Sequence, residues 1–191
     1  MTGPLEIEVK LPVDDRDAAA RRIVEAGATE AQARAFEENV VFDFPDGRLE
    51  AARTMVRLRT GAGRALLTLK QPAGDTGIYK VRREVETGLD DPGPVRELLG
   101  AIGLVVAYRY QKFRTAYRAG DLLVTLDEVP IGTYIELEGS RDDIDTFARR
   151  LGYTRDAYIN LSYRDLQASH LVGRGGTDEP AEMIFPEASR H

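Results

Sequence analysis

A strict alternation of charged and apolar residues lies near the start of the chain: Glu6-Ile7-Glu8-Val9-Lys10. Successive side chains of a β-strand point to opposite faces of the sheet, so the three charged residues share one face and the two apolar residues share the other. Near the other end of the chain, Ile135-Glu136-Leu137-Glu138 repeats the alternation. Paired carboxylates that recur on one face of different strands indicate more than a solvated surface. We interpret them as part of a channel that holds metal ions against a polyanion.

The composition is that of a soluble globular protein. The 191 residues are 42% hydrophobic and 30% charged, which is enough to bury a core in a single domain, expected over residues 1–170. The sequence has no apolar run of membrane-spanning length and no signal-peptide pattern, so we expect a cytoplasmic protein with no membrane partner. The net charge of −6 argues against a nucleic-acid partner. The absence of cysteine excludes disulfides, thiolate metal sites and a thiol nucleophile.

Eight segments show the two-residue period of β-strands and are separated by turn signals. They are 5–11, 39–44, 54–60, 65–71, 79–87, 108–118, 121–129 and 133–138. Helices are expected at 15–26, 94–102 and 141–151, each ending near a glycine. Residues 171–191 are polar and glycine-rich at their start, so we expect an unstructured tail in which only 183–185 could dock onto the domain. Many strands and few helices predict an α+β fold, namely an eight-stranded antiparallel barrel with flanking helices.

Charged residues also share one face in most of the later strands. Arg57 and Arg59 flank a leucine, and Lys112 and Arg114 flank a phenylalanine. The other charged faces carry Lys70, then Lys80, Arg82, Glu84 and Glu86, then Asp127, and finally Glu136 and Glu138.

These charged faces point either all outward to water or all inward to a polar tunnel. Three features favour the tunnel. The basic residues come mostly as Arg-x-Arg or Lys-x-Arg pairs, acids and bases segregate onto different strands, and the helices need an apolar outer wall on which to pack. We therefore predict a barrel whose interior is charged.

The residues of such a tunnel fit one chemistry. With no cysteine, and with His170 and His191 in or near the tail, carboxylate oxygens favour Mg²⁺ or Mn²⁺ over Zn²⁺. The candidate metal ligands are Glu6, Glu8, Glu84, Glu86, Asp127, Glu136 and Glu138. The candidate phosphate-binding residues are Lys10, Arg57, Arg59, Lys70, Arg82, Lys112 and Arg114. A single phosphate does not need so many cations, whereas a triphosphate or polyphosphate does.

The order of these motifs resembles the CYTH family, which joins class IV adenylate cyclases with thiamine triphosphatases and inorganic triphosphatases. The matching segments are Glu6-x-Glu8-x-Lys10, Arg57-x-Arg59, Lys70-Gln71-Pro72, Arg82-Arg83-Glu84-Val85-Glu86, Lys112-Phe113-Arg114, the run from Asp127 to Glu138 with its glycine and Glu-x-Glu, and Ser162-Tyr163. The resemblance extends from about residue 5 to residue 166. The chain departs from the family at Leu161, where members often carry lysine, and at 39–43, where many carry a tyrosine.

The resemblance implies a triphosphate tunnel, an eight-stranded antiparallel barrel that binds triphosphate and divalent metal inside. It implies that Glu6, Glu8, Glu136 and Glu138 are metal ligands and that the basic residues above bind phosphates. Lys10, Lys70 and Asp127 are then the candidate catalytic residues, with Asp127 as a metal ligand or a water-positioning group. The alternation of charged and apolar residues places these residues on the same strand faces, independently of the resemblance to the family.

Three functions are compatible with this tunnel. The leading hypothesis is a metal-dependent hydrolase of a triphosphate-bearing small molecule: inorganic triphosphate, ATP or thiamine triphosphate. The alternative is a class IV adenylate cyclase that converts ATP to cyclic AMP and pyrophosphate. A third is a module that binds triphosphate or polyphosphate without catalysis, although anion binding alone would not need so many carboxylates. The sequence leaves a monomer and a homodimer equally open.

Overall fold

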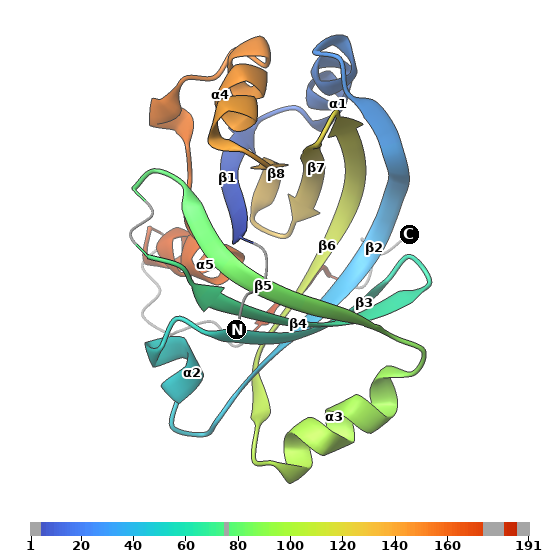
Figure 1. Ribbon diagram of the computed structural model, residues 1–191, viewed down its shortest axis with the longest axis vertical. Coiled ribbons are helices and arrows are strands. Elements are labelled where there is room, and N and C mark those ends of the chain that lie inside the picture. Colours follow the sequence, from blue (N-terminus) through green and yellow to red (C-terminus); the bar gives the residue numbers. More distant parts are fainter. Residues whose placement is uncertain (1–4, 75–76, 174–181, 187–191) are drawn as a thin grey trace.

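Nine strands and five α-helices form in the described part of the chain, which comprises residues 5–74, 77–173 and 182–186 of a computed structural model (Figure 1). The strands are β1 (Leu5–Val13), β2 (Thr29–Asp43), β3 (Met55–Gly61), β4 (Arg64–Pro72), β5 (Lys80–Leu89), β6 (Val105–Ala119), β7 (Leu122–Val129), β8 (Gly132–Glu138) and β9 (Glu182–Met183). The helices are α1 (Arg16–Glu25), α2 (Arg48–Ala51), α3 (Pro92–Ala101), α4 (Arg141–Arg150) and α5 (Tyr163–Val172), with a short 3₁₀ turn at Arg155–Ala157.

The first eight strands close into an antiparallel barrel, which confirms the predicted fold. Their order is β2-β3-β4-β5-β1-β8-β7-β6, and pairing of β2 with β6 completes the circle. A hairpin joins β6 to β7 through Gly120, whose φ of 62° lies in the left-handed region that glycine adopts readily. β9 lies outside the barrel and pairs in parallel with β6 at Arg109 and Tyr110.

Strand β2 begins ten residues earlier than expected, at Thr29 instead of residue 39. Its first half pairs with β6, but the register shifts between Glu30 and Gln32 and again between Gln32 and Ala35. Such bulges place two residues opposite one and so break the alternation of faces. The two-residue period is therefore hidden in this part of the sequence.

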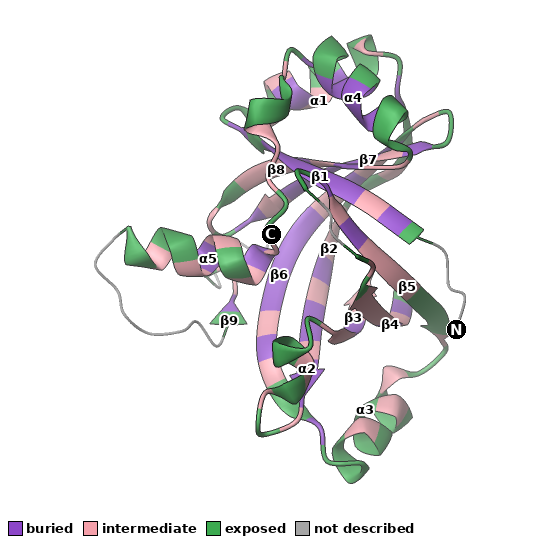
Figure 2. Cartoon of the chain, turned by 60° about the vertical axis from the view of Figure 1, so that its left-hand side comes forward, coloured by how far each residue is buried: buried purple, intermediate pink, exposed green. Residues whose placement is uncertain are grey.

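The barrel wall is apolar on its outer side, where helices cover it. α1 and α4 lie side by side over β1, β7 and β8 (Figures 1 and 2). The core between these helices and strands includes Ile23, Ile144 and Phe147 from the helices and Leu11 and Leu137 from the strands, all buried. On the opposite side, α2 and α3 cover a smaller apolar cluster on β2 and β3. With the apolar residues turned outward to the helices, the other face of each strand is left for polar residues.

Helix α5 was not predicted, and it closes part of the barrel interior. It starts at Ser162, whose hydroxyl accepts from the Asp165 backbone N–H while the Asp165 carboxylate accepts from the Ser162 N–H, a reciprocal cap. Its first residue, Tyr163, packs with Tyr110 and Tyr134 in a buried cluster.

The expected unstructured tail falls mostly outside the described residues, which omit 174–181 and 187–191. Its described part is ordered: Met183 is buried against Tyr108 and Tyr110, and Phe185 contacts Phe113. Docking of 183–185 is thus observed. Among the described residues, no helix is both long and apolar enough to cross a membrane.

Candidate functional site

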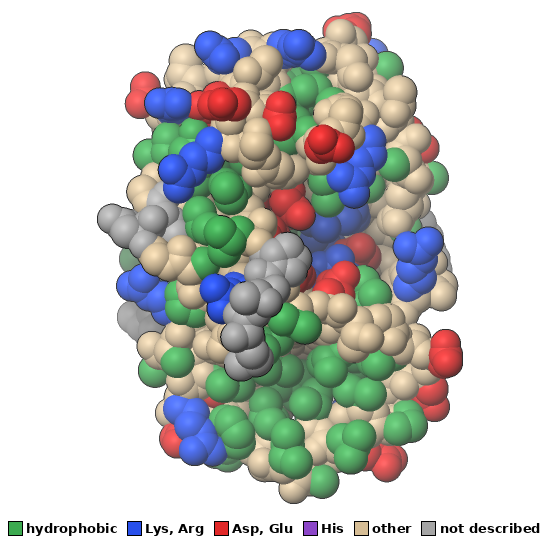
Figure 3. Space-filling view, viewed as in Figure 1, with side chains coloured by type: hydrophobic (Ala, Val, Ile, Leu, Met, Phe, Trp, Pro, Cys, Tyr) green, Lys and Arg blue, Asp and Glu red, His purple; other side chains and the backbone are tan. Residues whose placement is uncertain are grey.

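The inward faces of the strands line a cavity of about 800 Å³ inside the barrel. Acidic and basic side chains gather in a hollow near the middle of the molecule (Figure 3). All but one of the predicted site residues line this cavity: Glu6, Glu8, Lys10, Arg57, Arg59, Lys70, Arg82, Glu84, Glu86, Lys112, Arg114, Glu136 and Glu138. The exception is Asp127. The alternation of charged residues along the strands therefore faces inward, as expected.

One end of the cavity, which we call the acidic end, is formed by Glu6, Glu8, Glu84 and Glu138 with their lysine partners. The Lys70 ammonium donates to both carboxylate oxygens of Glu6, each at 2.5 Å, and lies 3.3 Å from Glu84. Burial raises the pKa of Glu6 to about 8 despite Lys70, because the neighbouring carboxylates also oppose its charge. Burial likewise raises the pKa of Glu138.

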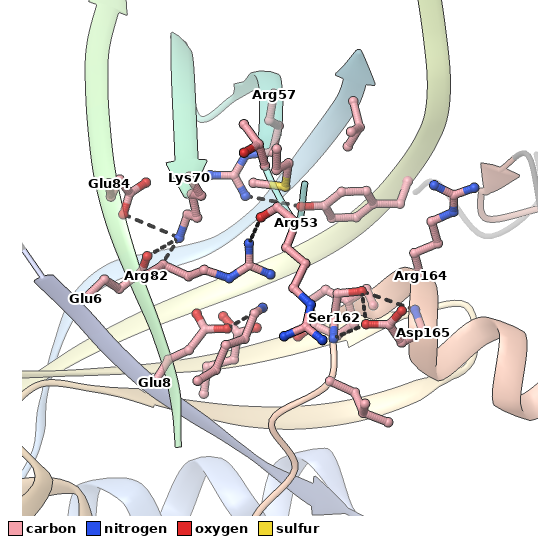
Figure 4. Close-up of a pocket in the computed structure, with 18 of the residues that line it drawn as sticks. Glu6, Glu8, Arg53, Arg57, Lys70, Arg82, Glu84, Ser162, Arg164 and Asp165 are labelled. Carbon is pink, nitrogen blue, oxygen red and sulfur yellow. Dashed lines mark hydrogen bonds and ion pairs between the residues drawn. The ribbon is translucent and has the colours of Figure 1, made fainter. Parts of the chain in front are cut away.

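Glu8 lies at this end too, but it is compensated by bases. Lys80 Nζ lies 2.7 Å from Glu8 Oε1, and Lys10 Nζ lies 3.2 Å from the same oxygen. Burial alone would raise the pKa of Glu8, but Lys10, Lys80 and Lys70 outweigh it and hold this pKa well below its ordinary value. Figure 4 shows Glu6, Glu8, Lys70 and Glu84 around this part of the cavity.

The other end, the basic end, is built around Arg114 on β6. Its Nε donates to Asp127 Oδ1 at 2.6 Å, and its Nη2 reaches both Asp127 Oδ2 and Glu136 Oε2 at 2.5 Å. Asp127 also accepts from Lys112 Nζ and from the Tyr163 hydroxyl, each at 2.9 Å. Lys10 bridges the two ends, since its Nζ lies 3.2 Å from Glu136 as well as from Glu8.

Asp127 thus lies beneath the cavity instead of on its surface. Its side chain has no exposed area and is engaged by three donors. A carboxylate held in this way fixes the direction of Lys112 and Arg114. The position differs from the expected one, in which Asp127 was a metal ligand or a catalytic residue in the tunnel.

Arg57 and Arg59 complete the basic end from β3. Arg57 donates to the Tyr110 hydroxyl at 3.2 Å and to the Thr68 hydroxyl at 3.3 Å. Arg59 donates its Nε to Asn39 Oδ1 at 3.3 Å. Burial, together with the nearby positive charge of Arg57, lowers the pKa of Arg59. An arginine short of negative partners in a buried cavity is suited to bind an anion.

Several residues of the site were missed by the sequence reasoning. Glu37 and Asn39 lie two residues apart on β2 and face Arg59, and Lys112, Arg114 and Arg59 lower the pKa of buried Glu37 to about 2. Asn39 was already the first residue of the predicted strand 39–44, and extending that strand to its true start would have placed Glu37 on the same inner face. Tyr110 precedes Lys112 by two residues on β6, so the two-residue period places it on the same inner face.

The mouth of the cavity between α2 and α5 carries further arginines (Figure 4). Arg82 donates to the backbone carbonyl of Arg53 at 2.7 Å, and Arg53 has a φ of 52°, which non-glycine residues adopt rarely. Arg164 on α5 pairs with Glu50 on α2 at 2.7 Å. The first contact ties β5 to the segment that follows α2, and the second joins α2 to α5 across the opening.

The carboxylates of the acidic end have the donor chemistry of a Mg²⁺ or Mn²⁺ site. A divalent cation would offset the uncompensated charge that raises the pKa values of Glu6 and Glu138. In the described part of the chain, however, no three aspartate, glutamate or histidine side chains converge as a preformed metal site. Lys70 and Lys80 instead hold Glu6 and Glu8. The carboxylates therefore fit a hard cation, provided that Lys70 or Lys80 moves away from its carboxylate when the cation binds.

Comparison with known proteins agrees with this architecture. A family model described as the CYTH domain matches residues 4–151. A Methanocaldococcus jannaschii protein named "Putative adenylate cyclase" is 25% identical over 174 residues, which cover 85% of this chain and 98% of that one. A structure from Vibrio parahaemolyticus, described as "a putative adenylate cyclase", superposes with a TM-score of 0.78 at 20% identity and covers 87% of this chain and 99% of its own. A Hippeastrum structure, described as a "putative adenylyl cyclase" that "reveals a dominant" triphosphatase activity, has a TM-score of 0.57 at 18% identity and covers 91% and 97%.

Proposed function

Because the chain belongs to the CYTH domain family, we propose that its cavity is the active site of a metal-dependent enzyme that hydrolyses inorganic or organic triphosphates. The convergence of seven basic side chains with four carboxylates in one cavity carries this proposal. The basic residues are Lys10, Arg57, Arg59, Lys70, Arg82, Lys112 and Arg114, and the carboxylates are Glu6, Glu8, Glu136 and Glu138. So many buried cations are suited to the charge of a triphosphate chain.

The basic end would bind and align the phosphates. Arg59 lacks a full complement of negative partners, and Arg57 donates to neutral hydroxyls and lies 3.9 Å from Glu86, so both guanidinium groups can contribute charge to a bound anion. Arg114 and Lys112 are fixed by Asp127 before substrate arrives. Donors that are already in place need little reorganisation when charge develops on the transferred phosphoryl group.

Lys10 and Lys70 would act as cations and not as bases. Although burial opposes their charge, Glu8 and Glu136 raise the pKa of Lys10, and Glu8 and Glu6 raise the pKa of Lys70. Both ammonium groups therefore stay protonated near neutral pH. Asp127, which has no exposed area, would serve as a positioning residue for Lys112 and Arg114.

Glu6, Glu8 and Glu138 would hold the divalent cation, with Glu84, Glu86 and Glu136 near enough to contribute charge. When bound, Mg²⁺ or Mn²⁺ would neutralise phosphate oxygens and lower the pKa of a bound water. Burial would strengthen the attraction between a bound cation and these carboxylates, because few solvent dipoles screen it.

Class IV adenylate cyclase is the second candidate, and one observation favours it. The cavity of about 800 Å³ is larger than a triphosphate alone requires, and it extends to the mouth between α2 and α5. Several similar proteins also bear the name of adenylate cyclase. In this reaction the ribose 3′-hydroxyl would attack the α-phosphorus and pyrophosphate would leave.

The test is to incubate the purified protein with ATP and with inorganic triphosphate, each with Mg²⁺ or Mn²⁺, and to resolve the products by chromatography. Orthophosphate release, fastest from inorganic triphosphate, is expected. Cyclic AMP with an equal amount of pyrophosphate would establish the cyclase instead. Metal-dependent triphosphate binding without any turnover would establish a binding module.

The role of the acidic end is tested by Glu8→Gln, which keeps the shape of the side chain and removes its charge. We expect turnover to fall by about a hundredfold or more, the usual effect of removing one preorganised charged group. Glu128→Gln is the matched control, because Glu128 lies on the outer face of β7 and contacts Arg34. Wild-type rates for Glu8→Gln at saturating metal would show that Glu8 is not a metal ligand.

A further inference from the structure

All four lysines of this chain lie in the cavity. The sequence has 26 lysines and arginines, of which only Lys10, Lys70, Lys80 and Lys112 are lysines. Each of them lines the cavity, and none has a side chain more than 17% exposed. At the other 22 basic positions the chain uses arginine. Lysine thus occurs only in the cavity. There a compact ammonium on a flexible chain can move between partners more easily than a planar guanidinium.

Three of these lysines belong to the motifs that relate the chain to its family, but Lys80 does not. It lies on β5 directly across from Glu8 on β1, and both side chains face inward. Its Nζ is 2.7 Å from Glu8 Oε1, a shorter contact than the 3.2 Å that Lys10 makes with the same oxygen. Lys80 therefore occupies a carboxylate oxygen that a divalent cation would need.

The charge of Lys80 is poorly compensated where it lies. Among the described residues its ion-pair partner is Glu8 alone, which it shares with Lys10, and the further cation Arg82 lines the same cavity. Glu8, by contrast, has a second ammonium at hand in Lys10. The Lys80–Glu8 pair is thus one that a stronger cation could replace at small cost.

We propose that Lys80 is a tethered substitute for the metal ion: it holds Glu8 when no divalent cation is bound, and it must leave Glu8 when one binds. The inference rests on the proposed function in one respect, that Glu8 is a metal ligand. An ammonium released into the same cavity is then free to contact a phosphate. Metal and triphosphate would therefore bind cooperatively, each favouring the state in which Lys80 has left Glu8.

The proposal is tested by direct Mn²⁺ binding to the protein without substrate, measured from the electron paramagnetic resonance signal of free Mn²⁺. Lys80→Met removes the competing ammonium and keeps an unbranched side chain. We expect its Mn²⁺ dissociation constant to fall by about tenfold relative to the wild type, the order expected for loss of one buried contact charge. Lys80→Arg keeps the charge and is expected to bind Mn²⁺ as weakly as the wild type.

Arg82→Met is the matched control. Arg82 lies two residues farther along β5 on the same face, carries the same charge, and donates to a backbone carbonyl. If lost tunnel charge alone strengthened Mn²⁺ binding, Arg82→Met and Lys80→Met would have equal effects, and this result would overturn the proposal. In a Glu8→Gln background, Lys80→Met should no longer change the Mn²⁺ affinity.

The outcomes separate this inference from the function on which it rests. Equal Mn²⁺ affinity of the wild type and Lys80→Met would overturn the role of Lys80 and leave the metal site intact. Absence of Mn²⁺ binding by every variant would instead overturn the metal dependence of the proposed enzyme. Circular dichroism of each variant verifies that the barrel is folded, and Lys80→Gln replaces Lys80→Met in the comparison if the latter is not.

Discussion

Glu136 and Glu138 lie two residues apart on the same face of β8, yet their surroundings shift their pKa values in opposite directions. Burial alone would raise the pKa of Glu136, but Lys10, Arg114 and Lys112 hold it well below its ordinary value. Burial raises the pKa of Glu138, and Lys70 opposes this only in part. Glu8 and Glu6 on β1 show the same contrast, with a lowered and a raised pKa.

The contrast shows that the cavity is polarised along its length. At the basic end every carboxylate is matched by at least one base, and burial beside Arg57 leaves Arg59 with charge available for an anion. At the acidic end the carboxylates outnumber the bases that hold them. A cation fits one end and a phosphate chain the other, so the unliganded protein already distinguishes the two sites that the proposed reaction needs.

The largest effect on stability is expected when the basic end loses its central residue, in Arg114→Met. Arg114 contacts both Asp127 and Glu136, and the variant leaves both buried carboxylates short of a partner. Breaking a buried ion pair from one side costs about 3–5 kcal/mol. The free energy of unfolding, measured by urea denaturation at neutral pH without metal, should fall by this amount.

Arg109→Met provides the control for that measurement, because Arg109 pairs with Glu38 at 2.8 Å outside the cavity and its side chain is 43% exposed. Removal of such a surface pair costs about 0–1 kcal/mol. Equal losses in the two variants would mean that the pairs at the basic end stabilise the fold no more than surface pairs do.

Glu6 at the acidic end is expected to make the folded protein less stable as the pH rises, whereas an ion-paired carboxylate with a lowered pKa does the opposite. The pKa of Glu6 rises from 4.5 to about 8 on folding, so the folded state binds the proton more tightly. Its contribution to stability is therefore complete below about pH 4.5 and is lost as the pH rises through about 8. We expect the wild type to lose stability relative to Glu6→Gln across this window, by about 1.4 kcal/mol for each pH unit between the two pKa values.

Urea denaturation of both proteins at several pH values gives this difference directly. Other titrating groups are common to the two proteins and cancel in the comparison. Mn²⁺ added at the upper end of the window should restore the stability of the wild type and not of Glu6→Gln, because a bound cation stabilises the ionised carboxylate. Parallel stability curves for the two proteins would show that Glu6 titrates as an exposed glutamate does.

The sequence predicted the barrel and its charged interior because both follow from the alternation of residues. Glu6, Glu8 and Lys10 obey a two-residue period, and a strand fixes the face of each residue once the face of one is known. The motifs also lie on strands that are neighbours in the barrel, such as β1 and β8, so the site is assembled by strand pairing alone.

Other parts of the site could not be predicted from the two-residue period of the strands. Bulges in β2 disrupt the alternation before Glu37 and place Glu37 outside the predicted strand. Asp127 has the inward parity of a ligand, but its depth depends on the three donors that cover it, which come from β6 and α5. Helix α5 itself was missed because most of its residues are polar and its position depends on one inserted tyrosine. Parity gives the face of a residue, whereas its depth and partners depend on segments far away in the sequence.

Tyr163→Phe tests that inserted tyrosine and is expected to have the smallest effect. Burial raises the pKa of Tyr163 well above its ordinary value, so its hydroxyl stays a donor to Asp127 at 2.9 Å. Phenylalanine keeps the ring that lies 5.1 Å from Lys10 Nζ and removes only this hydrogen bond. Because Lys112 and Arg114 still hold Asp127, the free energy of unfolding should fall by about 1 kcal/mol. The Mn²⁺ affinity should not change, since Tyr163 does not contact the carboxylates of the acidic end. A weaker Mn²⁺ affinity in Tyr163→Phe would mean that the two ends of the cavity are coupled through Lys10, and that its polarity belongs to one connected network and not to two separate sites.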